Sequence, residues 1–238
     1  MKVALSVHGV FHSFDLAREL YARGSLAGIL TAYPRFKLRA EGLPQELIHT
    51  FPLIHGAYRA FPWRHRIGVS WERQWERLDA MSFAAYVGRN LPSCDVYVGM
   101  SGTSLPGGRR AHRMGARYIC DRGSSHIRVQ DRIEREEGEL WGLPAVGVDP
   151  RVIDAEEAEY AAADRITVPS GFVYRTFLSE GVAPEKLRKL PYGVNLSRFG
   201  PDGAPAEGRF DVLFVGYFYL RKGVSCRPLK RSSIRPKA

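Results

Sequence analysis

The sequence predicts an α/β protein built on a doubly wound parallel sheet, a Rossmann-like fold. Short apolar runs rich in β-branched residues alternate along the chain with segments of helical periodicity. Gly, Pro, Ser or Asp stands at most of the boundaries between them. The hydrophobic content of 45% and the charged content of 25% are those of a globular protein. A parallel sheet that is covered on both faces buries such strands.

The first elements follow from local signals. Residues 2–8 alternate small apolar and β-branched side chains before Gly9, which predicts a strand. Ser13 is the expected cap of a helix that ends at Gly24. The apolar positions of that helix recur at helical spacing: Phe14, Ala17, Leu20 and Tyr21. Residues 27–32 return to a strand-like run.

The same alternation continues through the middle of the chain. Residues 94–100 (CDVYVGM) predict a strand, residues 104–114 a helix and residues 115–121 (GARYICD) another strand. Asp149 and Pro150 predict a helix start, because Asp caps well and Pro suits the first helical position. That helix is expected to run to about residue 163.

Three more elements complete the expected domain. Residues 165–168 predict a strand, residues 172–180 a helix closed by Gly181, and residues 187–190 a short strand. The sequence therefore predicts one domain over residues 1–199.

The C-terminal part has a different character. Residues 200–208 (GPDGAPAEG) predict a linker, and residues 210–215 (FDVLFV) begin a new buried strand. No apolar helical stripe follows, so residues 209–224 predict only the start of a second domain. Residues 225–238 form a basic tail with two prolines. A frameshift or a truncated gene is the simplest explanation for such an end.

Charge and cysteine usage limit the functional class. Seven of the basic residues that produce the net charge of +10 lie in residues 217–238, a segment without Asp or Glu. The remaining charge is ordinary, which argues against nucleic-acid binding. Cys94, Cys120 and Cys226 lack metal-ligand spacing, so no metal site is predicted. Unpaired cysteines and apolar runs too short for a bilayer or signal peptide predict a cytoplasmic protein.

The loop HGVFHS at residues 8–13 joins the first strand to a helix N-terminus. Backbone amides and the positive end of the helix dipole suit a phosphate or sugar oxygen there, with Gly9 and His12 as the contacts. The loop lacks the GxGxxG spacing of dinucleotide-binding folds. An ordinary tight turn is the alternative interpretation.

The loop DRGSSH at residues 121–126 follows a predicted strand, where parallel sheets place their ligand crevice. Arg122 and Ser125 offer a charged and a hydroxyl contact, and His126 can exchange a proton near neutral pH. The alternative is a loop whose Asp and Ser satisfy local backbone amides.

Residues 58–77 interleave aromatic side chains with arginines. Trp71, Trp75, Leu78, Ser82 and Tyr86 fall on one face of a predicted helix that Ser70 is expected to cap. The favoured interpretation packs these tryptophans inward and leaves the arginines in water. The alternative is contact with an anionic membrane interface or a lipid-linked acceptor.

Taken in order, these segments resemble family 4 glycosyltransferases, which have the two-lobed GT-B architecture. The resemblance is carried by ADRITVPS at 163–170, PYGVNLSRF at 191–199 and VGYFYLRKG at 215–223. It implies metal-free, retaining transfer of a sugar from a nucleotide diphosphate sugar, without a cofactor. The implied acceptor is a glycan, a lipid-linked glycan or a small molecule, and the implied location is the cytoplasm or the inner face of the membrane.

The resemblance also assigns residues. It implies His126 as the catalytic, acceptor-side histidine, and Gly216, Arg221 and Lys222 as contacts of the donor diphosphate. Tyr217 stands where many members have an arginine. Because most of the donor lobe is absent, no transfer is expected from this chain alone. The alternative is a non-catalytic module that retains affinity for an acceptor or partner.

Overall fold

The computed structural model describes residues 1–60, 69–143, 147–193 and 215. The chain divides into two compact units. The first comprises Met1–Ile127 and Asp149–Val194, and the second comprises Arg128–Val148 and Asn195–Ala238. The predicted linker, the second-domain start and the basic tail lie outside the described residues, apart from Val215. The proposed domain boundaries therefore remain predictions.

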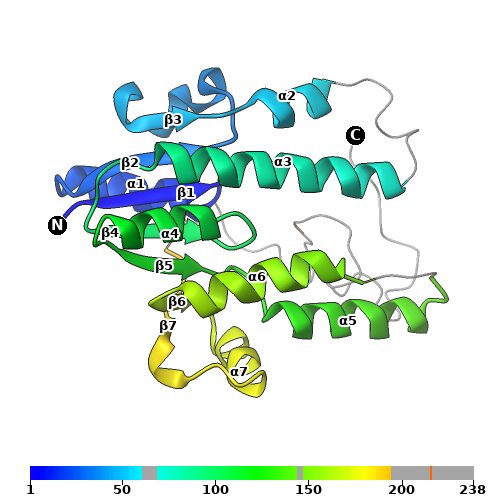
Figure 1. The fold of residues 1–238 in the computed structure, drawn as a ribbon. Coiled ribbons are helices and arrows are strands. Elements are labelled where there is room, and N and C mark those ends of the chain that lie inside the picture. Colours follow the sequence, from blue (N-terminus) through cyan, green and yellow to red (C-terminus); the bar gives the residue numbers. More distant parts are fainter. Residues whose placement is uncertain (61–68, 144–146, 194–214, 216–238) are drawn as a thin grey trace, which may run out of the picture. The chain divides into compact units, whose positions relative to one another are not determined.

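A seven-stranded, all-parallel sheet forms the centre of the first unit (Figure 1). Its spatial order is β3-β2-β1-β4-β5-β6-β7. The strands are β1 (Val3–Val7), β2 (Leu26–Thr31), β3 (Ile48–Thr50), β4 (Val96–Met100), β5 (Arg117–Asp121), β6 (Arg165–Val168) and β7 (Leu187–Lys189). The chain moves from β1 to β2 and β3, then returns to place β4 on the other side of β1. The topological switch point is therefore between β1 and β4.

Helices cover both faces of this sheet, which confirms the predicted doubly wound α/β class. The helices of the first unit are α1 (His12–Ala22), α2 (Leu53–Ala60), α3 (Val69–Asn90), α4 (Leu105–Arg113), α6 (Pro150–Ala162) and α7 (Gly171–Ser179). Figure 1 shows α3, α4 and α6 side by side along one face, while α1 lies behind the strands.

Local capping signals explain several of these boundaries. The Asp149 side chain accepts a hydrogen bond from the Arg151 backbone N–H at 2.9 Å, as a helix cap should. Gly24 and Gly181 have φ of 64° and 83°, the left-handed conformation expected just after a helix. The prediction for Ser13 was wrong. The helix begins one residue earlier, so Ser13 lies buried inside its first turn.

Among the described strands and α-helices, three have no counterpart in the prediction. β3 spans three residues, α2 spans eight, and α5 (Ile127–Leu140) is dominated by charged side chains. Segments that are so short or so polar carry little periodic apolar signal.

The predicted inner face of α3 was also wrong. Asp79, Phe83, Ala84 and Val87 are the buried positions among the described side chains of α3, whereas 68% of Trp71 is exposed. The helix starts at Val69, so the predicted cap Ser70 lies within it.

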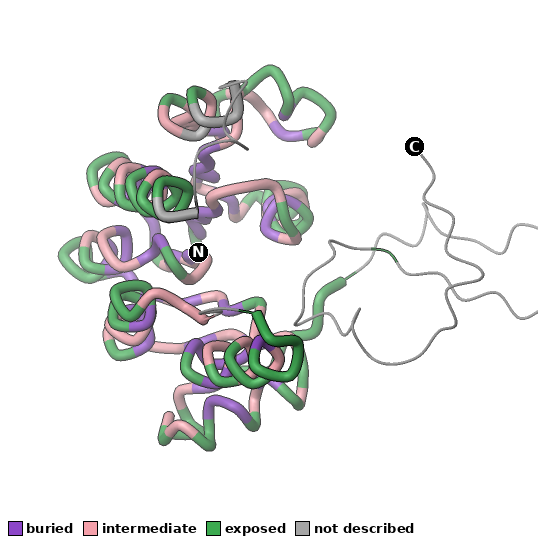
Figure 2. Tube along the Cα trace, turned by 90° about the vertical axis from the view of Figure 1, so that its right-hand side faces the viewer, coloured by how far each residue is buried: buried purple, intermediate pink, exposed green. Residues whose placement is uncertain are grey.

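Apolar side chains from the strands and the helices that face them form the core, which appears as buried segments through the sheet in Figure 2. Two glycines bring α4 close to this core. A Cβ atom on Gly107 would lie 2.6 Å from the Tyr97 hydroxyl, and one on Gly108 would lie 2.4 Å from the Tyr118 ring. Any larger residue would therefore push α4 away from two fully buried tyrosines.

The described part of the second unit consists mainly of α5 beyond its first residue. Asp131 of this helix forms an ion pair with Arg135 and accepts a hydrogen bond from the Val148 backbone N–H at 2.8 Å. Across both units, none of the described helices has the length and apolar character needed to cross a membrane.

Candidate functional site

His12 and Asp121 meet at the carboxyl edge of the sheet, although 109 residues separate them in the chain. His12 is the first residue of α1, and its Nε2 lies 2.6 Å from the Asp121 Oδ2. The Thr167 hydroxyl donates to the other carboxylate oxygen at 2.7 Å. Because the carboxylate accepts at both oxygens, it fixes the imidazole with Nε2–H toward Asp121. The His12 Nδ1 then keeps a lone pair that can accept a proton or hydrogen bond from a ligand hydroxyl.

Tyr192, in the segment after β7, covers this pair. Its ring stacks on the His12 imidazole with the ring centroids 4.0 Å apart. Burial, together with the nearby charge of Asp121, raises the pKa of Tyr192 to about 12. Gly123 makes this placement possible, because a Cβ atom there would lie 2.6 Å from the Tyr192 hydroxyl oxygen.

We expect Gly123→Ala to displace the Tyr192 ring and return its pKa from about 12 toward the ordinary value of 10.0. The added methyl group occupies the position of the phenol oxygen, so the ring must move into water. Phenolate absorbance across an alkaline pH titration measures the change. Subtracting the titration of Tyr192→Phe, alone and combined with Gly123→Ala, isolates this tyrosine. An unchanged Tyr192 titration would contradict the prediction.

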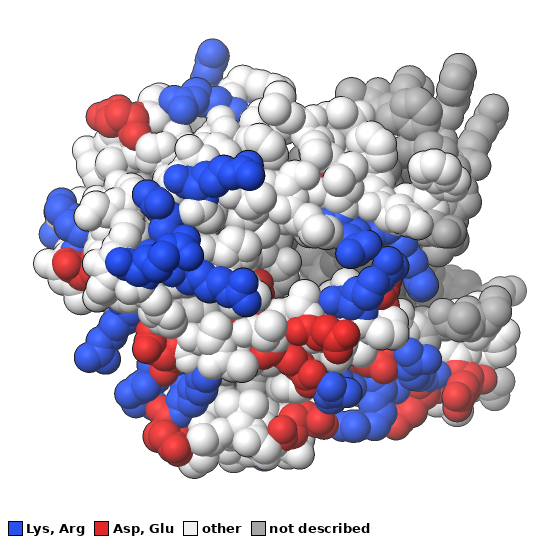
Figure 3. Space-filling view, in the orientation of Figure 1, with Lys and Arg blue, Asp and Glu red and all other residues white. Residues whose placement is uncertain are grey.

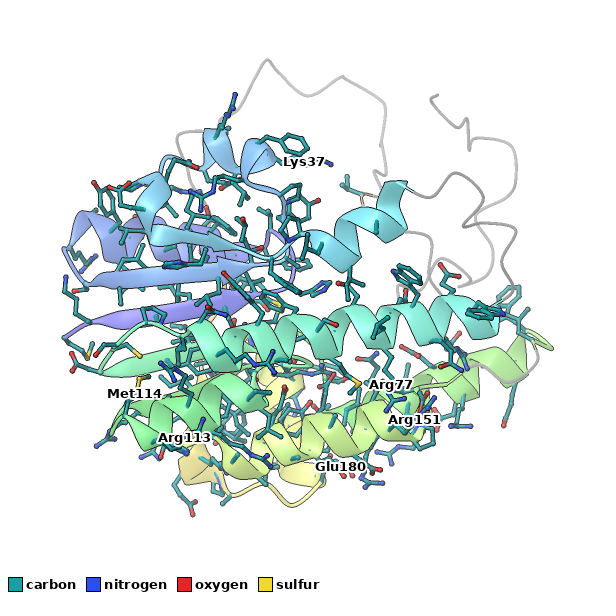
Figure 4. The ribbon with its side chains drawn as sticks, turned by 45° about the horizontal axis from the view of Figure 1, so that its top comes forward. Lys37, Arg77, Arg113, Met114, Arg151 and Glu180 are labelled. Carbon is teal, nitrogen blue, oxygen red and sulfur yellow. The ribbon has the colours of Figure 1, made fainter. Side chains whose placement is uncertain are left out.

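A cavity of about 850 Å³ lies beside the switch point, and we call it the switch-point cavity. It is lined by α3 between Arg73 and Ala84, by α6 between Arg151 and Glu159, by the loops that follow β1 and β4, and by the first two residues of α4. Figure 4 shows Arg77 of α3 and Arg151 of α6 near one another, and both line the cavity. The polar residues that line it are His8, Arg73, Glu76, Arg77, Asp79, Thr103, Asp149, Arg151, Glu156 and Glu159, and Trp75 adds an aromatic ring.

The polar groups of the cavity are mostly held in place by neighbours. The His8 Nε2 lies 3.1 Å from the Asp79 Oδ2. The Arg151 guanidinium contacts the Asp149 carboxylate at 2.6 Å and lowers the pKa of that carboxyl to about 2. The hydroxyl of Thr103 is buried and has no hydrogen-bond partner within the described residues. A polar ligand in this cavity would therefore meet oriented carboxylates, guanidinium groups and one hydroxyl that needs a partner.

The carboxylate of Glu159, a residue of α6, lies at the N-terminus of α4, where a fold of this class often binds a ligand anion. Its carboxylate accepts from the backbone N–H groups of Gly102 and Ser104 at 2.6 Å each, and from Leu105 at 3.2 Å. Burial nevertheless raises the pKa of Glu159 to about 7. The chain's own carboxylate thus satisfies this helix end, a role that sequence reasoning missed. The spacing of Glu156 and Glu159 on an otherwise apolar helix face was the available signal.

Arg122 does not occupy the ligand-contact position predicted for it. Its side chain is buried, and its Nη1 lies 2.6 Å from the Glu156 Oε2 and 3.1 Å from the Ser101 Oγ. Its Nε donates a hydrogen bond to the backbone oxygen of Ser125, and Ser125 is itself a buried residue. The Tyr160 hydroxyl completes the cluster by donating to Glu156 at 2.5 Å. Arg122 and Ser125 therefore join the loops behind the site instead of facing a ligand.

His126 is likewise a buried residue in this structure. Only 3% of its surface is exposed, and its ring packs edge-on against Phe177 and beside Tyr160, at centroid distances of 4.9 and 5.1 Å. Its backbone N–H donates to the Thr176 hydroxyl at 3.0 Å. An imidazole enclosed in this way does not reach the carboxyl-edge surface, which contradicts the catalytic role predicted for His126.

Of the remaining predicted contacts, the structure describes Gly9 but not the residues predicted to contact the diphosphate. Gly9 lies in the loop after β1, and its backbone oxygen accepts from the Thr31 hydroxyl at 3.1 Å. A Cβ atom there would lie 3.0 Å from the ring of Phe11. The predicted diphosphate contacts Gly216, Arg221 and Lys222 lie outside the described residues.

The fold and site therefore define a doubly wound α/β unit with a polar cavity at its switch point. One similar solved structure is UDP-GlcNAc 2-epimerase from Methanocaldococcus jannaschii, with a TM-score of 0.47 and 12% identity over 79% of this chain and 45% of that chain. Another is a UDP-glucosyltransferase from Polygonum tinctorium capable of glucosylating indoxyl, with a TM-score of 0.45 and 13% identity over 81% of this chain and 52% of that chain. A third is UDP-GlcNAc 2-epimerase from Neisseria meningitidis bound to UDP-GlcNAc, with a TM-score of 0.44 and 11% identity over 79% of this chain and 45% of that chain. This chain spans about half the length of these proteins. Neither protein-family models nor curated proteins give a match.

Proposed function

We propose that this chain contributes the acceptor-binding lobe of a glycosyltransferase that uses a nucleotide sugar as donor. The observation that carries the proposal is the switch-point cavity, which lies at the edge of the sheet where doubly wound proteins bind their ligands. The motifs at residues 163–170, 191–199 and 215–223 support the same conclusion from sequence.

The lining of the cavity suits a sugar. Carboxylates accept hydrogen bonds from neighbouring hydroxyl groups, and the guanidinium groups of Arg77 and Arg151 donate to hydroxyl and ring oxygens. Trp75 adds an apolar ring surface against which the C–H face of a sugar packs. An acceptor glycan, free or lipid-linked, is the ligand class that matches this combination.

In the proposed reaction, an acceptor hydroxyl oxygen forms a bond to the anomeric carbon of the donor. The bond from that carbon to the diphosphate oxygen breaks, and the hydroxyl proton leaves with the diphosphate. Retention of the anomeric configuration is what the family resemblance implies. His12, oriented by Asp121, is not among the residues that line the cavity, and we propose it as a separate contact for a ligand hydroxyl at the carboxyl edge of the sheet. Lys222, Arg221 and Gly216 are proposed to meet the diphosphate, whose developing charge needs cations.

Filling the cavity tests the proposal. Ala155 is an exposed residue of α6 that lines the cavity, so Ala155→Trp is expected to weaken acceptor binding at least about tenfold without disturbing the core. Saturation-transfer NMR with a panel of mono- and oligosaccharides measures binding to the purified chain.

The matched control is Ala161→Trp, at another exposed alanine of the same helix that does not line the cavity. It should leave binding unchanged. If no saccharide binds, or if both tryptophan variants bind as well as the wild type, the cavity is not an acceptor site.

A further inference from the structure

A second hollow, distinct from the switch-point cavity in its character, lies between α3 and α4 and has a volume of about 420 Å³. We call it the α3–α4 groove. Its floor is apolar or backbone, and three arginines form its rim. The floor residues are Met81, Ala84, Ala85, Gly88, Leu105 and Pro106, and the rim residues are Arg89, Arg109 and Arg113. No acidic side chain is among them.

The described residues do not neutralise the rim arginines. Within the described part of the chain, none of Arg89, Arg109 and Arg113 has an ion-pair or hydrogen-bond partner from a side chain. Figure 3 shows Lys and Arg side chains gathered over α4 and the adjoining end of α3, and Figure 4 places Arg113 on the outer side of α4. Unpaired cations around an apolar floor are complementary to an anionic group that carries an apolar body.

Large apolar side chains extend this surface along α3. Trp71, Leu78 and Met81 are 68%, 51% and 56% exposed. Their spacing of seven and three residues places them on one face of the helix, and Ala85 and Arg89 continue the same face into the groove. This exposed stripe replaces the inward packing that the sequence predicts for Trp71. Exposed apolar side chains in line with arginines are typical of helices that lie in a membrane interface.

We propose that the α3–α4 surface, defined as the groove together with Trp71 and Leu78, docks this chain onto a membrane that contains anionic phospholipids. The arginines contact the phosphate groups, and the apolar stripe enters the boundary between headgroups and acyl chains. A polyanion such as a nucleic acid fits less well, because it would leave the apolar stripe in water. The inference goes beyond the proposed function and does not depend on what the switch-point cavity binds.

Co-sedimentation of the full chain with lipid vesicles tests the inference. We expect binding to vesicles of phosphatidylcholine with phosphatidylglycerol, and at least about tenfold weaker binding to phosphatidylcholine alone. The triple variant Arg89→Ser, Arg109→Ser, Arg113→Ser should lose at least about tenfold in affinity for the anionic vesicles. The matched control removes three charges from the basic C-terminal tail, Arg227→Ser, Arg231→Ser, Arg235→Ser, and should retain most of the binding.

The apolar stripe gives an independent readout. Trp71→Ser with Leu78→Ser should weaken vesicle binding without changing any charge, and the blue shift of tryptophan emission on binding should disappear in Trp71→Phe. Equal losses from the groove and tail triple variants would show that bulk charge alone drives binding and would overturn the inference. So would a DNA oligonucleotide that displaces the chain from vesicles and whose binding needs the three groove arginines but not Trp71 or Leu78.

Discussion

Replacing Arg122 with methionine is expected to lower the free energy of unfolding by about 3–5 kcal/mol, because it leaves the Glu156 carboxylate buried without its ion-pair partner. Arg122 also joins the loops after β4 and β5 through Ser101 and the backbone of Ser125. Urea unfolding followed by circular dichroism measures the loss.

Two further variants separate the cost of the unpaired charge from other effects of the substitution. Combining Arg122→Met with Glu156→Leu removes both charges and should recover most of the lost stability. Arg151→Met breaks a pair with Asp149 that lies at the surface, and its unfolding midpoint should stay close to that of the wild type. A single-variant loss at Arg122 no larger than that at Arg151 would mean that the buried pair does not hold these loops together.

The second large effect concerns pH. Burial raises the pKa of Glu159 to about 7 in the folded protein, above the ordinary value of 4.5. The folded state therefore holds a proton that the unfolded state has already lost between these two pH values. Consequently, the contribution of Glu159 to stability falls as the pH rises from about 4.5 to about 7, by about 3 kcal/mol in total.

Glu159→Gln removes this titration. As the pH rises through that window, the free energy of unfolding of the wild type should fall relative to that of Glu159→Gln. The difference between the two should level off above about pH 8. Glu19→Gln, at an exposed position on α1, provides the control and should give a flat difference. If the wild type instead gains stability over Glu159→Gln as the pH rises, the three backbone N–H groups of the α4 N-terminus lower the pKa of Glu159 by more than burial raises it.

The same three backbone N–H groups explain how the site is organised. In folds of this class the helix N-terminus next to the switch point is a ready site for a ligand anion. Here Glu159 fills it from within the chain, so the ligand groups of the cavity are side chains of α3 and α6 instead. A hydroxyl-rich ligand suits such a lining better than a phosphate does, which agrees with the proposed acceptor site.

The docking surface and the cavity share the helix α3. Four residues of α3 and α4 line both the switch-point cavity and the α3–α4 groove: Met81, Ala84, Leu105 and Pro106. If both proposals hold, a lipid-linked acceptor would enter the cavity from the membrane on which the chain is docked. The vesicle and saccharide experiments address the two proposals separately, because their test variants lie at different positions.

Local signals in the sequence were sufficient for most of the fold. Residues 165–168 and the helix that begins after Asp149 were predicted with their observed starts, since a β-branched run, a capping carboxylate and a proline act on their immediate neighbours. The doubly wound class followed from the alternation of such elements. The carboxyl-edge position of the DRGSSH loop followed from the strand before it.

Contacts between distant segments were decided only by the tertiary structure. His12 and Asp121 meet because the sheet order brings the ends of β1 and β5 near one another, and Glu159 reaches α4 across 55 residues. The weak amphipathic pattern of α3 left its inner face to be chosen by packing, which buried Phe83 and exposed Trp71. His126 stands in a loop at the ligand edge, yet its ring turned inward because Tyr160 and Phe177 offer an apolar pocket there. Sequence spacing encodes which element a residue belongs to, whereas the direction of its side chain depends on neighbours that only the folded chain supplies.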